Sequence, residues 1–347
     1  MIDQVKVLDF KLPGELYARE PKKEGERSRM IIGTKYNNSF KHSFVDEIYK
    51  ELEPGDTLII NNSKTVNGVI YGKSSEFGIL QFHLLRIEED ESVVKVFIRD
   101  DLIDSIVGET FEVSNRLLIT LIERKEGKEY FAKFNLDIAN VFEELSKHGE
   151  PIISNYAKHK LSIEDYQNEI STTLGSLENP VASGHFKRKI ISDLKEKGIN
   201  IGYITLNCIS MEAYITENKY SDHIVPPEIF NVPEETAELI TTTKKNNKKI
   251  ISVGTTATRT LESLEYDNDY NITSPLTKKT DLAIYPGYNF KIVDGVVTNF
   301  HGPRSSRLAL AAACISEEKI MNLYKEAIKE KYMFYEFGDC MLLWLNK

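Results

Sequence analysis

The sequence predicts an α/β fold in which a mixed sheet flanked by helices is interrupted by a small all-β insertion. Two helical segments, 186–197 and 234–245, each precede an apolar strand, 199–206 and 249–253. Helix followed by strand, repeated along a chain, is the pattern of a mixed or parallel sheet covered by helices. Between residues 67 and 135 the chain changes to short β-branched and aromatic runs separated by turns, which is typical of a small barrel or sandwich.

The residues before the insertion alternate between extended and helical patterns. Residues 7–13 form a short apolar stretch that ends at a proline, so we expect an extended segment there. Residues 44–52 have a helix-like pattern, and a Pro-Gly-Asp turn at 54–56 leads into an apolar strand at 57–60. These elements belong to the α/β part of the chain.

The remaining elements follow from the same signals. The insertion carries four strand-like runs, at 79–87, 93–98, 117–122 and 130–134. Further helical patterns lie at 138–147, 308–315 and 317–331, and Gly149, Gly198 and Pro233 supply the expected stop and start residues of three helices. The sequence therefore predicts an α/β domain made of residues 1–66 and 136–347, with residues 67–135 as the inserted β-domain.

Composition excludes several classes of protein. With 347 residues, 41% hydrophobic and 28% charged, the chain is an ordinary globular protein of one large or two medium domains. No window approaches the ~18 apolar residues of a membrane span, and the chain start lacks a signal-peptide pattern. Its three cysteines, Cys208, Cys314 and Cys340, are too far apart for a disulfide framework. We expect a cytoplasmic protein without membrane contact, as a monomer or a weak homo-oligomer.

Charge and motif spacing restrict the chemistry further. The net charge of −9 means that a polyanion such as RNA must be held by a local basic patch. The densest basic runs, 187–189 and 244–249, fit a phosphate contact or, more simply, a solvated helix face. The seven histidines show no metal-ligand spacing, and no phosphate loop, serine-hydrolase elbow or dinucleotide fingerprint is present. We therefore expect neither a metal nor a nicotinamide cofactor.

The sharpest local motif is a strand that passes through Gly254 into a hydroxyl-rich helix start. Thr255 and Thr256 then lie at the carboxyl end of a strand, where ligands bind in open α/β sheets. A helix N-terminus also favours a carboxylate, a phosphate or a ribose hydroxyl. Alternatively, Gly254 only makes the turn and the threonines only cap the helix.

A second group of candidates follows two later strands. Tyr285, Gly287 and Tyr288 form a Tyr-Pro-Gly-Tyr turn, and residues 299–304 contain an amide, an aromatic ring, an imidazole and a guanidinium. Such groups suit a ligand that carries adenine and a carboxylate, although His301 or Arg304 could instead anchor the loop to its own carbonyls. Ser305 or Ser306 is expected to cap the following helix.

A third candidate is His185, which lies in a small-residue loop at the entrance of a helix. A histidine placed there can accept or donate a proton near neutral pH if its pKa stays near the working pH. A capping or packing role fits the same position. The residues alone therefore leave both interpretations open.

These motifs, in the same order along nearly the whole chain, resemble the S-adenosylmethionine:tRNA ribosyltransferase-isomerases of the queuosine pathway. The start of the chain is similar to the family's start, with Asp9-Phe10, Leu12-Pro13, Pro21 and Ser28-Arg29. The blocks 254–256, 259–263, 280–281, 285–288, 298–305 and 337–341 are close matches.

The resemblance implies an α/β domain interrupted by a β-barrel, with S-adenosylmethionine as a substrate that donates its ribosyl unit. Adenine and methionine leave, and the family's acceptor is an aminomethyl-deazaguanine at the tRNA wobble position, where epoxyqueuosine is made. A base, a proton donor for adenine and the exclusion of water are then required. We expect His185 to act as general acid or base, with His301 as the nearest alternative. The expected S-adenosylmethionine contacts are Gly254, Thr255, Thr256, Arg259, Tyr285, Gly287, Tyr288, Asn299, Phe300, Arg304 and Asp339.

Departures from the family pattern lie in the middle of the chain. The family's Phe-Asn-Asp-Thr-Arg stands here as residues 60–64, with Asn62 and Lys64 in place of the carboxylate and the guanidinium. Its His-Val-Gly-Leu-Gly-Thr-Phe stands as residues 207–213, which begin with Asn207 and lack both glycines, so this wall of the pocket must change shape. We expect the changed blocks to face the acceptor. These acceptor-side residues are Asn61, Asn62, Lys64, Asn207 and Glu212.

Three functions follow from the sequence. The first is an enzyme that cleaves S-adenosylmethionine at its ribose but uses an acceptor other than tRNA. The second is a true tRNA ribosyltransferase-isomerase, and the third is a catalytically inactive protein that binds a nucleoside or RNA. Adenine release measured with and without acceptor tRNA separates the three.

Overall fold

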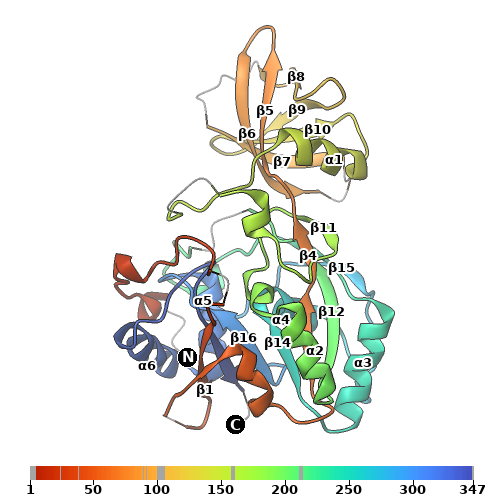
Figure 1. The fold of residues 1–347 in the computed structure, drawn as a ribbon. Helices are drawn as coiled ribbons and strands as arrows, with labels where there is room; N and C mark the ends of the chain where they lie inside the picture. The colour runs from red at the N-terminus through yellow and green to blue at the C-terminus, as the bar shows by residue number, and fades with distance from the viewer. Residues whose placement is uncertain are drawn as a thin grey trace.

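The chain folds into a helix-flanked sheet and a separate β-barrel (Figure 1). The computed structural model describes residues 5–23, 25–37, 39–88, 90, 92–99, 106–157, 161–210 and 214–345. In Figure 1 the barrel stands at the top, above the larger sheet. The predicted fold class, a mixed sheet flanked by helices with an inserted β-barrel, is confirmed.

The large sheet has the spatial order β15-β13-β12-β3-β14-β16-β17-β1-β2. Its strands are β1 (Arg29–Thr34), β2 (Lys41–Phe44), β3 (Thr57–Asn61), β12 (Asn200–Leu206), β13 (Glu228–Asn231), β14 (Ile250–Val253), β15 (Thr277–Thr280), β16 (Gly295–Asn299) and β17 (Cys340–Trp344). Strands β12, β3, β14 and β16 are parallel to one another, whereas β17 is antiparallel to β16. The four strands β3, β14, β16 and β17 are buried throughout, as expected for the centre of a helix-covered sheet.

Helices cover both faces of this sheet. These helices are α2 (Arg188–Glu196), α3 (Glu234–Lys245), α4 (Gly254–Ser263), α5 (Ser306–Ile315) and α6 (Glu317–Lys329), whereas α1 (Ile138–His148) packs on the barrel. Leu58 and Ile60 of β3 pack on the side of α2, while Ile59 faces the core of α3 to α6. This alternation follows from the two-residue period of a strand. None of the described helices is long and apolar enough to cross a bilayer.

Six strands close the barrel in the order β10-β7-β6-β5-β8-β9. They are β5 (Val69–Ser74), β6 (Gly78–Ile87), β7 (Val93–Ile98), β8 (Thr110–Glu112), β9 (Leu118–Arg124) and β10 (Glu129–Phe134). Gly72 lets Phe111 enter the barrel, since a Cβ at this glycine would lie 2.7 Å from the Cβ of Phe111. The barrel strands fall within the predicted insertion 67–135, but α1 also packs on the barrel core, and the exact division into domains stays a prediction.

Two predicted segments differ in type. Residues 7–13 were expected to be extended, but Val5–Leu8 is a 3₁₀ turn whose Leu8 is fully buried in the core. The helix-like pattern at 44–52 is the 3₁₀ segment Val45–Glu51. Both segments are short and bury only a few apolar side chains. They lack the continuous apolar face of a longer α-helix, and short segments of this kind often adopt the 3₁₀ form. Other 3₁₀ turns are Gly14–Leu16, Ile163–Tyr166, Val181–His185 (η6) and Tyr220–Asp222, and β4 (Ser63–Thr65) pairs with β11 (Thr173–Ser176).

Candidate functional site at the carboxyl edge of the sheet

The parallel strands bring the predicted motifs to one edge of the sheet. Strands β12, β3, β14 and β16 are adjacent and parallel, so their carboxyl ends lie side by side. Asn207, Asn62, Gly254 and His301 follow these ends, and Asp339 precedes β17, which starts at the same edge. We call this the carboxyl edge. It is the position at which ligands bind in open α/β sheets.

The segment η6 lies over this edge. The Ser183 hydroxyl donates to the carbonyl of Asn61 (2.8 Å). A Cβ at Gly254 would lie 3.3 Å from that of Ala182, and Gly254 has a φ of +89°. Glycine is favoured here by the left-handed backbone and by the close approach of η6. Thr255 and Thr256 follow in the first turn of α4, where both side chains are partly buried.

His185, at the end of η6, is held between two polar side chains. Its Nδ1 lies 3.0 Å from the Ser28 Oγ and its Nε2 lies 3.1 Å from the Asn299 Oδ1. The Asn299 amide donates through Nδ2 to the carbonyl of Tyr335 (3.0 Å), which fixes Oδ1 as the atom that faces His185. Because Oδ1 can only accept, the Nε2 of His185 carries the hydrogen and Nδ1 accepts from Ser28.

Burial keeps this imidazole neutral. Desolvation lowers the pKa of His185 to about 4, the hydrogen bond with Asn299 opposes this shift, and the nearby Lys22 ammonium adds to it. At neutral pH His185 is therefore not an imidazolium. Its ring can accept a proton if Ser28 moves, but it has no second proton to give.

We expect nitrogen NMR to find His185 in the neutral Nε2–H form at pH 7, with no protonation until the pH falls close to 4. The measurement is a long-range ¹H–¹⁵N correlation spectrum of the protein labelled at histidine, assigned with His185→Gln. Titration of this ring near pH 6.5, or a hydrogen on Nδ1, would contradict the network described above.

Asp339 organises the same edge from the start of β17. Its Oδ1 accepts from the Lys22 ammonium (2.8 Å) and from the Arg29 amide (3.0 Å), and its Oδ2 accepts from the Met333 amide (2.9 Å). The carboxylate is only 2% exposed, so it fixes the start of β1 and holds Lys22 near His185. A direct contact between Asp339 and a substrate stays a prediction, since both oxygens already have protein partners.

Lys22 and Ser28 lie at the carboxyl edge but were not among the site residues predicted from the sequence. Both come from the first thirty residues and reach the edge only because β1 pairs with β17, more than 300 positions away. The one available signal was the resemblance of Pro21 and Ser28-Arg29 to the family's start. Sequence spacing alone cannot bring these groups to His185.

His301 has one nitrogen bound within its own loop. Its Nε2 lies 2.8 Å from the Thr298 Oγ1, and no described residue is found hydrogen-bonded to its Nδ1. Burial lowers the pKa of His301 to about 3, and the charge of Arg307 adds to the shift. His301 is thus also neutral at pH 7, and its Nδ1 is better placed than either nitrogen of His185 to contact a ligand.

Arg304 anchors a neighbouring segment. Its φ of +52° places it in the left-handed region, and its Nη2 donates to the carbonyls of Ile215 (3.3 Å) and Glu217 (3.2 Å). The expected alternative was an anchor to carbonyls of its own loop, whereas Arg304 instead binds carbonyls of the distant segment 215–217. Ser305 accepts from the Leu308 amide (3.1 Å) and caps α5. Of the two serines expected as the cap, Ser305 and Ser306, it is the first that fills the role.

Phe300 does not face the carboxyl edge. Its ring is fully buried and packs against Tyr324, Tyr332 and Phe334, with ring centroids 4.9–5.5 Å apart. This arrangement gives no support to the expected contact of Phe300 with S-adenosylmethionine, which stays a prediction. The strand period explains the arrangement, because Asn299 and His301 point away from the core when Phe300 points into it.

Arg259 also has a structural position. Its guanidinium is ion-paired with Glu228 and donates to the carbonyls of Leu282 (2.9 Å) and Thr280 (3.1 Å). It therefore ties α4 to β13 and β15. With three protein partners already in place, the geometry gives no support to the expected contact with S-adenosylmethionine.

The Tyr-Pro-Gly-Tyr turn lies along α4 rather than at its start. Tyr285 stacks on Tyr220 at 5.8 Å, and the Tyr288 hydroxyl lies 3.3 Å from the carboxylate of Glu262 in the last turn of α4. Gly287 has a φ of +98°, as a tight turn requires. The turn is thus packed against the second half of α4, two helical turns from Gly254, and its predicted ligand contacts find no support in this arrangement.

The predicted acceptor-side residues divide into structural and accessible ones. Asn61 is fully buried. Its Nδ2 donates to the carbonyl of Leu206 and its Oδ1 accepts from the amide of Leu206, so it joins β3 to β12. Asn207 packs against Gly175, where a Cβ would lie 2.7 Å from the amide, and its buried Oδ1 has no partner among the described residues. Lys64 lies partly buried in β4, and Glu212 lies outside the described residues.

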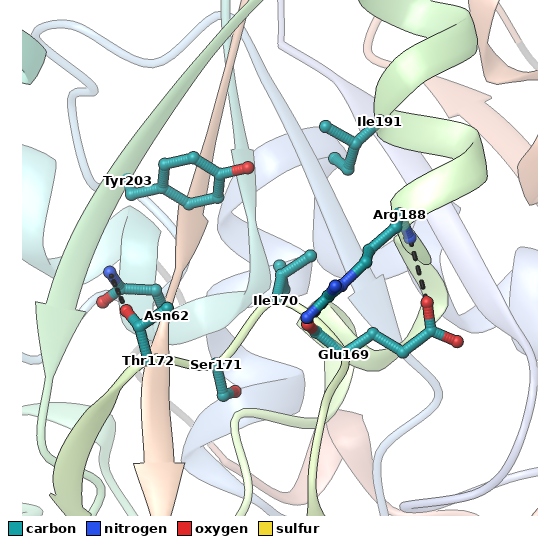
Figure 2. Close-up of a pocket in the computed structure, with 8 residues that line it drawn as sticks. All are labelled: Asn62, Glu169, Ile170, Ser171, Thr172, Arg188, Ile191 and Tyr203. Atoms are coloured by element: carbon teal, nitrogen blue, oxygen red, sulfur yellow. Dashed lines mark hydrogen bonds between the residues drawn. The ribbon is translucent and has the colours of Figure 1, made fainter.

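Asn62 lines an open pocket of about 330 Å³ on the α2 side of the carboxyl edge (Figure 2). Its amide donates to the Thr172 hydroxyl (3.1 Å) and accepts from the Thr205 hydroxyl (2.7 Å). Figure 2 shows the ring of Tyr203 across the pocket from Arg188, whose backbone amide donates to the carboxylate of Glu169. In the sequence Arg188 is visible only as part of the basic run 187–189, and no local motif indicates this pocket.

Comparisons with known proteins agree with this fold and site. A family model described as queuosine biosynthesis protein matches residues 5–343. The S-adenosylmethionine:tRNA ribosyltransferase-isomerase of Staphylococcus haemolyticus is 32% identical over 98% of this chain and 99% of its own length. The enzyme of the same name from a Thermoanaerobacter species is 34% identical over 96% of this chain and 98% of its own length. A solved S-adenosylmethionine tRNA ribosyltransferase from Thermotoga maritima has a TM-score of 0.54 and 28% identity, covering 97% of this chain and 99% of that one.

These likenesses, together with the polar network at the carboxyl edge, define an enzyme of the transferase and isomerase type. No group of metal-ligating side chains is found among the described residues. The chain belongs to the queuosine biosynthesis protein family. The family membership predicted from the sequence motifs is thereby confirmed.

Proposed function

We propose that this protein transfers the ribosyl unit of S-adenosylmethionine to a base of tRNA and isomerises it. The observation that carries this proposal is the likeness to two tRNA ribosyltransferase-isomerases, which spans 96–98% of this chain. The sequence likeness therefore extends over both the barrel and the carboxyl edge. An acceptor other than tRNA, expected from the departures at residues 60–64 and 207–213, has no support from these relatives.

The chemistry needs groups that hold a sulfonium nucleoside and move protons near its ribose. The sulfonium makes the ribose 5′ C–H acidic, so a base can remove that proton before adenine leaves. His301 is neutral at pH 7 and its Nδ1 has no described partner, so this nitrogen is available to accept a proton when Nε2 donates its hydrogen to Thr298. His185 and Ser28 lie close by, and Thr255 and Thr256 offer hydroxyls and backbone amides at the start of α4.

Adenine release from S-adenosylmethionine tests the proposal. We expect release only when tRNA carrying the aminomethyl-deazaguanine is added, together with a tRNA product that has gained the ribosyl unit. We expect His301→Ala to slow release by 10²–10⁴-fold, the usual contribution of a general acid or base. The matched control is His148→Ala on the surface of α1, which should leave the rate unchanged.

The other outcomes identify the other functions. Release that is independent of tRNA but needs a small amine would favour a changed acceptor. Binding of S-adenosylmethionine without any release would favour a catalytically inactive protein. If His301→Ala kept its rate while His185→Ala lost it, the proton would be moved through His185 instead.

A further inference from the structure

Glu336 is a buried carboxylate that the reaction described above does not use. Its Oε1 accepts from the Ser154 hydroxyl (2.6 Å). Its Oε2 is shielded from solvent and has no hydrogen-bond partner in the described part of the chain. Burial raises the pKa of Glu336 and the charge of Glu178 adds to this, while Ser154, Arg307 and the nearby hydroxyl of Tyr156 oppose it. A buried acceptor without a donor is destabilising, and more so when it is charged.

Glu336 directly follows Tyr335, whose ring belongs to a group of three tyrosines, and Tyr156 of this group lies near the carboxylate. Tyr156 stacks on Tyr335 with centroids 4.5 Å apart, and Tyr17 meets Tyr335 edge-on at 5.1 Å. All three side chains are partly exposed, so the group borders solvent. The faces of such rings attract cations such as quaternary ammonium groups, because their π-electrons are negative. We call Glu336 and these rings the tyrosine–glutamate cluster.

The cluster adjoins the carboxyl edge. The Tyr335 amide donates to the carbonyl of Phe300 (3.0 Å), and the Tyr335 carbonyl accepts from the Asn299 amide that also faces His185. The Tyr335 hydroxyl covers Gly302, where a Cβ would lie 3.1 Å from it. A ligand bound beside His301 therefore lies next to the tyrosine–glutamate cluster.

We propose that the tyrosine–glutamate cluster is a subsite for a cationic group of a substrate, either a sulfonium or an ammonium. The Oε2 of Glu336 supplies the negative charge, and the rings of Tyr156 and Tyr335 supply the faces, whereas the ring of Tyr17 already has the Arg19 guanidinium 5.6 Å from its centroid. The identity of the cation rests on the proposed function, in which S-adenosylmethionine carries a sulfonium and an ammonium and the acceptor carries an amine. The cluster itself is argued only from its geometry.

The test compares Glu336→Gln with the wild type by calorimetry and kinetics. Glutamine keeps the size of the side chain and an acceptor for Ser154 but removes the charge. We expect a roughly tenfold to hundredfold loss in one of two quantities. If the cation is the sulfonium, affinity for S-adenosylmethionine falls while that for S-adenosylhomocysteine, whose sulfur is neutral, does not. If the cation is the ammonium of S-adenosylmethionine, affinity for both compounds falls, because both carry it. If the cation is the acceptor amine, only the KM for acceptor tRNA rises.

Glu144→Gln is the matched control, because Glu144 is a buried carboxylate that accepts from Ser114 at the same distance, 2.6 Å, far from the edge on α1. Tyr156→Leu is a second variant that keeps the carboxylate and removes one ring face. Equal behaviour of the wild type, Glu336→Gln and Tyr156→Leu towards every ligand would overturn the proposal.

A separate arm keeps this proposal distinct from the proposed function. Trimethylsulfonium and methylammonium ions are titrated while NMR follows the tyrosine rings. A shift of these rings that depends on Glu336, in a protein that binds no S-adenosylmethionine, would support the subsite and refute the proposed function. Binding of S-adenosylmethionine that is unchanged in Glu336→Gln, with no response of the rings to either ion, would refute the subsite alone.

Discussion

Replacing Glu262 by alanine is expected to lower the free energy of unfolding by about 3–5 kcal/mol. The side chain is 1% exposed and accepts from three consecutive backbone amides, those of Lys291 (2.8 Å), Ile292 (3.1 Å) and Val293 (3.0 Å). It also receives the hydroxyl of Tyr288. Truncation leaves these buried donors without an acceptor, and each such group costs about 1–3 kcal/mol.

Urea unfolding followed by fluorescence measures this loss. Trp344 is the one tryptophan in the sequence and is buried in β17, so its emission reports on the α/β sheet rather than on the barrel. Glu265→Ala is the matched control, because its carboxylate is 69% exposed and should change stability by less than about 0.5 kcal/mol. Equal unfolding midpoints for the two variants would show that Glu262 does not hold the 291–293 segment.

The elements of this fold were largely predictable because their signals are local. The helices at 138–147 and 234–245 and the strands at 79–87 and 93–98 agree with the structure to within a residue. Helix stops such as Gly149 and Gly198, and apolar periodicity over a dozen residues, do not depend on distant partners. The 3₁₀ segment Val45–Glu51 was harder, since seven residues contain too few turns to separate two helix types.

The carboxyl edge could be predicted as a place but not as a set of side chains. Gly254 follows β14 and Asn299 ends β16, and because these buried strands are adjacent and parallel, topology alone brings the two residues together. Which neighbouring side chain faces the edge depends on packing from other elements. Arg259 lies one helical turn further along α4 and forms an ion pair with Glu228 on β13. No spacing in the sequence predicts this pair.

Residues supplied by distant segments were the main omission. Lys22 meets Asp339 across 317 positions, and Ser154 meets Glu336 across 182. Such contacts depend on how loops close over the sheet, for which a single sequence carries no periodic signal. The departures from the family pattern, in contrast, were visible in the sequence, and Asn62 now appears as a link between Thr172 and Thr205.

Acidification from pH 7 to pH 5 is expected to cost the folded state about 4 kcal/mol through His185 and His301 together. Burial lowers their pKa values to about 4 and about 3, against an ordinary value of about 6.5 in the unfolded chain. Above pH 6.5 the rings are neutral in both states and contribute no pH dependence. Below pH 6.5 the two histidines bind protons in the unfolded chain but stay neutral in the folded chain. The free energy of unfolding therefore falls by about 1.4 kcal/mol per pH unit for each ring.

The double variant His185→Gln, His301→Gln isolates this contribution. Other groups also titrate in this range, and protonation of Glu178 and Glu336, whose pKa values burial raises, acts in the opposite direction by relieving buried charge as the pH falls. The histidine contribution is therefore the difference between the wild type and the variant in urea unfolding free energy at pH 7, 6 and 5. We expect the wild type to lose more stability on acidification than the variant. His148→Gln, a change on the exposed face of α1, should leave the wild-type slope unaltered, whereas parallel slopes for the wild type and the double variant would show that the two rings are protonated in the folded protein.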